Sequence, residues 1–161
     1  MSSPHRGKWH AAMVEELKAL EDNDTFELVP RSCKEVVQGR WVFATKLGVN
    51  KEEIYKARFV AKGFAQSQGV NYTETFSPTL KMVSVRILLD LAVNQNLLLH
   101  HVDFSNAYLN SIIDHEIYVE QPDGFKVEGK NCEELVLKLN KGLYGLKQSG
   151  RLWNELPQFF M

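Results

Sequence analysis

Cysteine is scarce in this 161-residue sequence, which contains only Cys33 and Cys132. Neither lies in a Cys-x-x-Cys spacing or beside a pair of histidines, so neither a zinc site nor a disulfide framework is indicated. Hydrophobic runs are short as well. None approaches the ~20 apolar residues that a membrane helix needs, and residues 1–6 lack the apolar core of a signal peptide. We therefore expect a cytoplasmic or nuclear protein with reduced thiols and no membrane partner.

A large net charge is also absent, because 19 lysines and arginines nearly balance 20 aspartates and glutamates. The net charge of -1 argues against a nucleic-acid partner, but the charges are unevenly distributed along the chain. Residues 31–62 contain eight basic and three acidic side chains, an excess of five positive charges. This basic segment is either the solvated face of a strand or a surface that contacts phosphates. Its basic residues are Arg31, Lys34, Arg40, Lys46, Lys51, Lys56, Arg58 and Lys62.

The composition is that of one soluble globular domain, with 44% apolar and 24% charged residues. Apolar side chains recur every three or four positions over residues 9–20, which predicts an amphipathic helix that covers a core. Residues 25–29, 40–47 and 55–61 are rich in residues that favour strands. The turn-prone residues 48–50 predict that the last two strands form a hairpin. Such a hairpin places several cations along one phosphate chain.

The second half of the sequence predicts a mixture of helices and strands, and hence an α+β fold. Residues 81–94 are apolar on nearly every side, which predicts a buried helix. Residues 97–102 predict a strand that ends at Asp103, followed by a short helix through Leu109. The remaining expected elements are strands at residues 117–119 and 135–139 and a turn at residues 121–124.

Asp103 is the most informative single residue, because it directly follows an apolar run and its carboxylate therefore lies in a short polar turn. Mg²⁺ prefers hard oxygen ligands held on rigid backbone, so this carboxylate suits a metal site beside a triphosphate. The alternative is a helix N-cap, since Ser105 and Ala107 are able to open a helix. His100 and His101 are expected to be structural, because consecutive strand residues point to opposite faces.

Five segments are similar, in order and spacing, to motifs of one polymerase family. They are WHAAMVEELKAL (residues 9–20), NDTFELVP (residues 23–30), YKARFVAKGF (residues 55–64), YTETFSP (residues 72–78) and GLYGLKQ (residues 142–148). From about Trp9 to Trp153, the chain resembles the reverse transcriptase of copia-type LTR retrotransposons. That enzyme is an RNA-directed DNA polymerase, a nucleotidyltransferase within a gag-pol polyprotein. The resemblance implies fingers and a partial palm, with mixed or antiparallel strands packed against helices in a truncated domain.

The resemblance divides the chain into an N-terminal tail, residues 1–8, and one partial reverse transcriptase domain, residues 9–161. Within that domain the fingers cover about residues 25–80 and the partial palm about residues 81–161. These polymerases carry an aromatic-x-Asp-Asp hairpin farther downstream, and this sequence contains no Asp-Asp pair. We therefore expect an N-terminal polymerase fragment that is inactive alone.

The resemblance also implies roles for individual residues. Asp103 would be a catalytic residue, the first of three aspartates that bind Mg²⁺, in a site that is incomplete in this chain. Tyr108 would lie beside the nucleotide sugar as a steric gate or, alternatively, pack a helix on the sheet. The glycines of residues 142–148 permit close backbone approach. The remaining residues implied to bind nucleotide or template are Lys56, Arg58, Lys62, Tyr144 and Lys147.

The implied partners are an RNA or DNA template-primer and deoxynucleoside triphosphates. Two alternatives do not involve polymerisation. In the first, the basic segment binds nucleic acid with an affinity that falls steeply with salt, because each neutralised phosphate releases counterions. In the second, the chain associates with an intact polymerase through an exposed sheet edge.

Overall fold

Three α-helices, two 3₁₀ turns and six strands form in a computed structural model that describes residues 5–31, 35–48, 50–129 and 134–156. Both cysteines and residues 1–4 lie outside the described residues. In chain order the elements are α1 (Arg6–Asp22), β1 (Phe26–Pro30), β2 (Val36–Val37), β3 (Gly39–Leu47), β4 (Glu53–Ala61), η1 (Gly63–Ala65), α2 (Met82–Asn94), η2 (Ala107–Asn110), β5 (Tyr118–Val119), β6 (Leu135–Leu139) and α3 (Ser149–Glu155).

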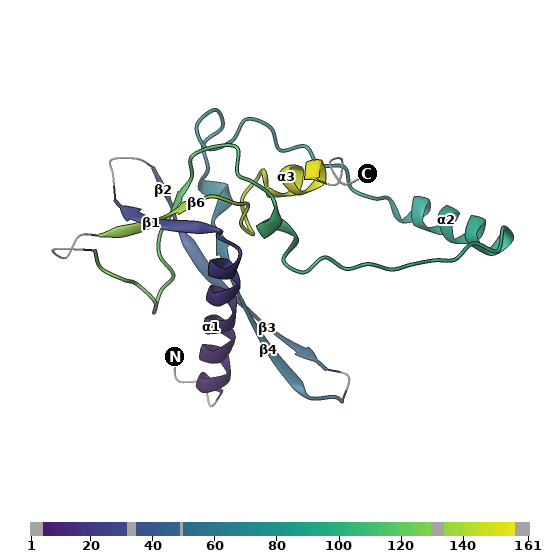
Figure 1. Ribbon diagram of the computed structural model, residues 1–161, viewed down its shortest axis with the longest axis horizontal. Helices are drawn as coiled ribbons and strands as arrows, with labels where there is room; N and C mark the ends of the chain where they lie inside the picture. Colours follow the sequence, from purple (N-terminus) through teal and green to yellow (C-terminus); the bar gives the residue numbers. More distant parts are fainter. Residues whose placement is uncertain (1–4, 32–34, 49, 130–133, 157–161) are drawn as a thin grey trace.

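β3 and β4 form an antiparallel hairpin that projects from the body of the molecule (Figure 1). Side chains alternate between the two faces of a strand, and in β4 Ala57, Phe59 and Ala61 are buried. α1 lies along β4, where its Ala12 and Met13 form a small apolar cluster with Ala57. Burying one large apolar side chain contributes about 1.5–3 kcal/mol. The apolar face of β4 therefore holds the hairpin to the body.

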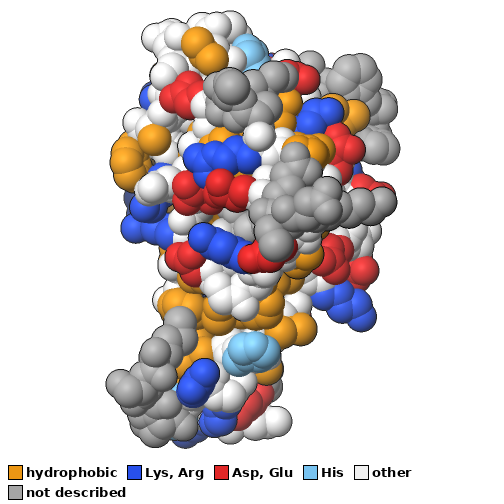
Figure 2. All heavy atoms as spheres, turned by 90° about the vertical axis from the view of Figure 1, so that its left-hand side faces the viewer, with side chains coloured by type: hydrophobic (Ala, Val, Ile, Leu, Met, Phe, Trp, Pro, Cys, Tyr) orange, Lys and Arg blue, Asp and Glu red, His pale blue; other side chains and the backbone are white. Residues whose placement is uncertain are grey.

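The second sheet has four strands in the order β1-β6-β5-β2. β6 pairs antiparallel with β1 and β5, whereas β2 pairs parallel with β5. The most deeply buried residues of the core that the sheet shares with α1 and β4 are Leu20, Phe59, Leu109, Ile117, Val119 and Leu143. On the outer face Lys138 pairs with Glu27, and Arg31 pairs with Glu134 at the strand ends. Positive and negative side chains are interspersed on that side of the molecule (Figure 2).

The structure confirms the α+β class and most of the predicted elements. The first helix extends beyond residues 9–20 at both ends, and the strands predicted at residues 40–47 and 55–61 pair as a hairpin. β1, β5 and β6 correspond to three of the other four predicted strands. Among the described helices none is long and apolar enough to cross a membrane.

The prediction that residues 81–94 form a buried helix is wrong in one respect, because α2 is exposed. α2 stands apart from the rest of the molecule at the end of two extended segments (Figure 1). Ala92 is the one buried residue of this helix, and most of its large apolar side chains are between 43% and 75% exposed. An apolar pattern produces burial only where another element packs on the helix. No described element covers α2.

The strand predicted at residues 97–102 is absent from the described part of the chain. This segment joins neither sheet, so Asp103 does not follow a strand. A strand requires a hydrogen-bonded neighbour, and no described strand lies beside this segment. The short helix predicted through Leu109 forms as the 3₁₀ turn η2. The residue before this turn, Asn106, is in the left-handed conformation (φ 51°).

Candidate functional site

Arg58, Tyr108 and Tyr144 meet although they come from three separate segments: β4, η2 and the loop of residues 142–148. The Arg58 guanidinium carbon lies 4.7 Å from the centroid of the Tyr144 ring. The rings of Tyr144 and Tyr108 are 4.7 Å apart between centroids and tilted by 59°. A cation–π contact contributes about 0.5–2 kcal/mol and an aromatic pair about 0.5–1.5 kcal/mol. The structure thus brings together three of the residues named by the motifs.

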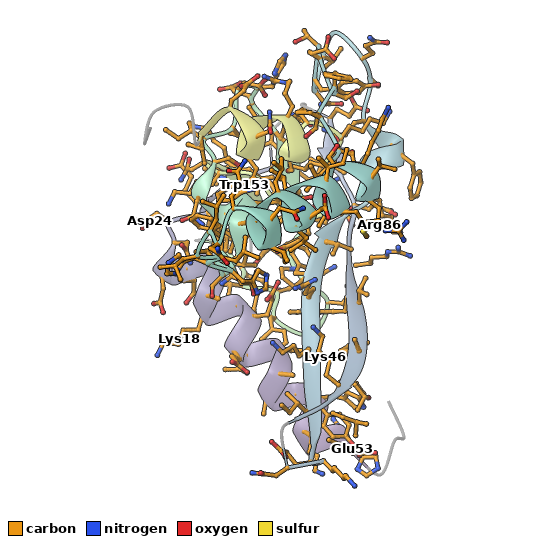
Figure 3. The ribbon with its side chains drawn as sticks, turned by 90° about the vertical axis from the view of Figure 1, so that its right-hand side faces the viewer. Lys18, Asp24, Lys46, Glu53, Arg86 and Trp153 are labelled. Atoms are coloured by element: carbon orange, nitrogen blue, oxygen red, sulfur yellow. The ribbon has the colours of Figure 1, made fainter. Side chains whose placement is uncertain are left out.

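Strand geometry places Arg58 on the face of the hairpin that points away from the core. In β4, Lys56 and Arg58 alternate with the buried Ala57 and Phe59. Residues paired across two antiparallel strands share a face, so β3 adds its own cations. The cations of this surface, here called the cationic face, are Arg40, Lys46, Lys56 and Arg58. Figure 3 shows Lys46 on the hairpin and Lys18 on the side of α1 turned away from it.

A cleft of about 390 Å³ lies at the end of the cationic face. Three of its lining residues are the cations Arg40, Arg58 and Lys62, and none of the described residues that line it carries a carboxylate. Phe64 also lines the cleft and is 80% exposed, and the Tyr144 ring forms another part of the wall. Lys62 donates a hydrogen bond to the Gln38 side-chain oxygen at 2.7 Å, which holds its ammonium group at the rim. Cations interleaved with aromatic rings are typical of surfaces that bind phosphates and unpaired bases.

The loop of residues 142–148 reaches β4 because its glycines allow the two backbones to touch. The Ala61 N–H donates to the Tyr144 carbonyl at 2.9 Å. A Cβ atom added at Gly145 would lie 2.1 Å from the Ala61 carbonyl oxygen, and one added at Gly63 would lie 2.0 Å from the Gly145 oxygen. The close backbone approach predicted for the glycines of residues 142–148 is confirmed at Gly145. It places the Tyr144 ring beside Arg58.

The buried amide side chains of Gln66 and Gln148, together with the backbone carbonyl of the buried Asn71, join the two loops that border the cleft. Gln66 donates to the Gln148 side-chain oxygen at 3.1 Å, and Gln148 donates to the Asn71 carbonyl at 2.8 Å. The Gln66 side-chain oxygen accepts the Lys147 backbone N–H at 2.9 Å. Their exposure is 5% for Gln66, 0% for Gln148 and 3% for Asn71. The sequence did not indicate these residues, because glutamine and asparagine in loops are ordinarily solvated.

Arg151 was also not indicated by the sequence, and it ties α3 to two other segments. Its guanidinium is ion-paired with Asp114 and, at 2.8 Å, with Glu155, and its Nε donates to the Glu74 carbonyl at 3.0 Å. Burial opposes ionisation of Asp114, but the His115 hydrogen bond and the Arg151 charge prevail and lower the pKa of this carboxyl. Arg151 therefore fixes the chain that follows the Tyr144 loop.

Lys147 and Lys56 do not line the cleft that contains Tyr144. The Lys147 ammonium donates to the Tyr72 hydroxyl at 3.0 Å and to the Gln66 carbonyl at 3.3 Å. Lys56 lines a smaller cleft, of about 130 Å³, between β4 and α1. The structure therefore gathers Arg58, Lys62 and Tyr144 around one cleft, with the Tyr108 ring packed against that of Tyr144, and places these two lysines elsewhere.

Asp103 offers one exposed carboxylate on an extended segment. Within the described residues no group of three or more His, Cys, Asp or Glu side chains could hold a metal ion, and His100 and His101 are exposed. Two bridged Mg²⁺ ions need several carboxylate oxygens. The donor set of the described residues therefore does not fit such a site.

A model of the family described as reverse transcriptase (RNA-dependent DNA polymerase) matches residues 23–161. The retrovirus-related Pol polyprotein from transposon TNT 1-94 of Nicotiana tabacum is 44% identical over 164 residues, covering 100% of this chain and 12% of that protein. The retrovirus-related Pol polyprotein from transposon RE2 of Arabidopsis thaliana is 40% identical over 149 residues, covering 91% of this chain and 10% of that protein.

More distant similarity extends to yeast. The truncated transposon Ty1-A Gag-Pol polyprotein of Saccharomyces cerevisiae is 34% identical over 128 residues, covering 80% of this chain and 10% of that protein. This chain therefore spans about a tenth of the length of these curated relatives. No solved structure matches it.

Proposed function

Because this chain belongs to the reverse transcriptase (RNA-dependent DNA polymerase) family, we propose that it provides the part of a Pol polyprotein polymerase that faces nucleotide and template. In this proposal residues 25–80 are the fingers and residues 81–161 contribute to the palm. The observation that carries it is the contact of Arg58 with the Tyr144 ring, which itself packs against the Tyr108 ring, beside a cation-lined cleft.

Each side chain in and around the cleft has a proposed role that follows from its chemistry. The Arg58 guanidinium presents a planar fork of donors that matches phosphate oxygens, and Lys62 adds a point charge at the rim. Tyr144 and Tyr108 offer ring faces to a sugar or a base. Lys56 lies on the cationic face, where it contacts the nucleic-acid backbone, and Lys147 supports the loop.

Asp103 is proposed as one metal-binding aspartate of the complete polymerase. Mg²⁺ supplies charge neutralisation and orientation of the triphosphate in such enzymes. One carboxylate does not assemble that site, so these 161 residues alone are proposed to bind substrate without joining nucleotides.

We expect no primer extension when the purified chain is incubated with an RNA template, a DNA primer, deoxynucleotides and Mg²⁺. A complete reverse transcriptase in parallel reactions shows that the substrates are competent. Extension that disappears in an Asp103→Asn variant would contradict the expectation, because it would mean that assembly brings in further carboxylates.

Arg58→Ala is expected to weaken binding of a labelled single-stranded RNA about tenfold, since a hydrogen bond to a charged group contributes about 1.5–3 kcal/mol. Fluorescence anisotropy over a salt series measures the effect, and the slope of log affinity against log salt should fall by about one.

Lys18→Ala is the matched control for Arg58→Ala. It removes one positive charge from the side of α1 turned away from the hairpin (Figure 3). Equal losses in the two variants would contradict a localised site. The cationic face also favours a second candidate function, a nucleic-acid-binding protein without catalysis, which predicts the same salt-dependent binding without extension.

A further inference from the structure

β4 has one edge paired with β3 and one edge facing α1. The Phe59 N–H points to the second edge, where it donates to a Glu16 carboxylate oxygen at 3.2 Å. An exposed strand edge leaves such donors unsatisfied unless another group covers them. Glu16, in the middle of α1, supplies the acceptor for the N–H of the peptide that joins Arg58 to Phe59.

Glu16 is partly buried, and burial disfavours the charged form of a carboxylate. Burial raises the pKa of Glu16, while the Phe59 N–H and the positive charge of Arg58 act in the opposite direction. A glutamine in the same place would accept the same hydrogen bond without the cost of burying a charge. The stability of the contact between α1 and β4 therefore does not explain why residue 16 is charged.

Of the neighbouring charges, that of Arg58 acts most strongly on the Glu16 carboxylate. Glu16 and Arg58 line the same small cleft between α1 and β4, together with Glu15, Lys56 and Asn106. The Arg58 guanidinium lies over Tyr144, on the opposite side of β4 from the buried Phe59. Two constraints thus act on Arg58: its peptide is tied to α1, and its charge is attracted by Glu16.

We propose that Glu16 is a positioning residue, which fixes the peptide after Arg58 and holds the guanidinium over Tyr144. The contribution of Arg58 to nucleic-acid binding rests on the proposed function. The positioning itself does not, because it is measured on the chain without a ligand.

NMR spectroscopy tests the proposal with three variants. Glu16→Ala removes the acceptor and the charge, Glu16→Gln removes the charge alone, and Glu15→Ala removes a neighbouring charge that makes no hydrogen bond to β4. The two signals to follow are hydrogen exchange of the Phe59 amide and the upfield shift that the Tyr144 ring imposes on the Arg58 Nε proton.

In Glu16→Ala the Phe59 amide is expected to exchange at least about tenfold faster, since a bond to a charged group is lost. The Arg58 proton should lose most of its ring shift. In Glu16→Gln the amide should stay protected while the ring shift is reduced, and in Glu15→Ala neither signal should change. An Arg58 signal that is unchanged in both Glu16 variants would overturn the proposal, as would an amide that stays protected in Glu16→Ala.

Binding of the labelled RNA gives an independent readout with a distinctive sign. Removing a negative charge beside the cationic face should strengthen binding of any polyanion, and Glu15→Ala is expected to do so slightly. Positioning predicts the reverse for Glu16→Ala, namely a severalfold weaker affinity. Tighter binding by Glu16→Ala would overturn the proposal. If the unaltered chain binds no RNA, the proposed function fails while the NMR result still decides the role of Glu16.

Discussion

Gly145→Ala is expected to lower the free energy of unfolding by about 2–5 kcal/mol. Gly145 has φ +91°, and an added Cβ would lie 2.1 Å from the Ala61 carbonyl oxygen. The obstructing atom is backbone, which cannot turn aside as a flexible side chain can. Either β4 and the loop separate, which breaks the bond from the Ala61 N–H to the Tyr144 carbonyl, or the strain is retained.

Gly124→Ala is the matched control, measured by urea denaturation monitored by circular dichroism. Gly124 has φ +87° but no atom within 4 Å of an added Cβ, so its variant carries only the backbone cost of about 1–2 kcal/mol. The difference between the two variants isolates the steric overlap. Equal destabilisation would contradict the close contact between loop and strand. Loss of the Tyr144 ring shift at Arg58 in Gly145→Ala alone would show that this contact orders the site.

Phe59→Ala is expected to destabilise the chain by about 3–5 kcal/mol, the usual cost of removing a buried aromatic side chain. Phe59 is 1% exposed, and its ring centroid lies 5.5 Å from that of Trp41. Its ring also lies so close to Gly39 that an added Cβ there would be 2.2 Å from its Cζ atom. The substitution leaves a cavity between α1 and both strands of the hairpin, which those elements cannot fill without separating.

Phe64→Ala provides the control, because it removes the same side chain from a position that is 80% exposed. Its effect on unfolding is expected to stay within about 0.5 kcal/mol. Denaturant unfolding of both variants, with slopes compared to that of the unaltered chain, measures the difference. A cost for Phe59→Ala close to that for Phe64→Ala would contradict the packing of α1 on the hairpin.

Local patterns predicted most of the fold correctly. The apolar repeat of residues 9–20 and the alternation over residues 55–61 specify a helix and a strand whatever surrounds them, because their periods are properties of the backbone. The same kind of pattern predicted the helix at residues 81–94 correctly but not its exposure, and it failed to predict the structure of residues 97–102. A pattern indicates which residues are apolar, but burial and strand pairing also need a neighbouring element. No described element packs on α2 or pairs with residues 97–102.

The candidate site was only partly accessible from the sequence. Motifs pointed to Arg58, Tyr108 and Tyr144, and the structure brings these three together, while their roles in binding remain predictions. The contacts of Glu16, Gln66, Gln148 and Arg151 were not predicted from the sequence, because their partners are distant along the chain or are backbone atoms.

By itself the sequence determined the family of this protein, the α+β class, the hairpin with its cations on one face, and the presence of Asp103 without an Asp-Asp pair. These are properties of residue order and of short-range periodicity. Only the tertiary structure decided that Arg58 lies over Tyr144, that amides lock the loops beside the cleft, and that α2 remains uncovered. The physical reason is that contacts and burial are set by which surfaces meet in space, and the chain brings together segments that no local pattern relates.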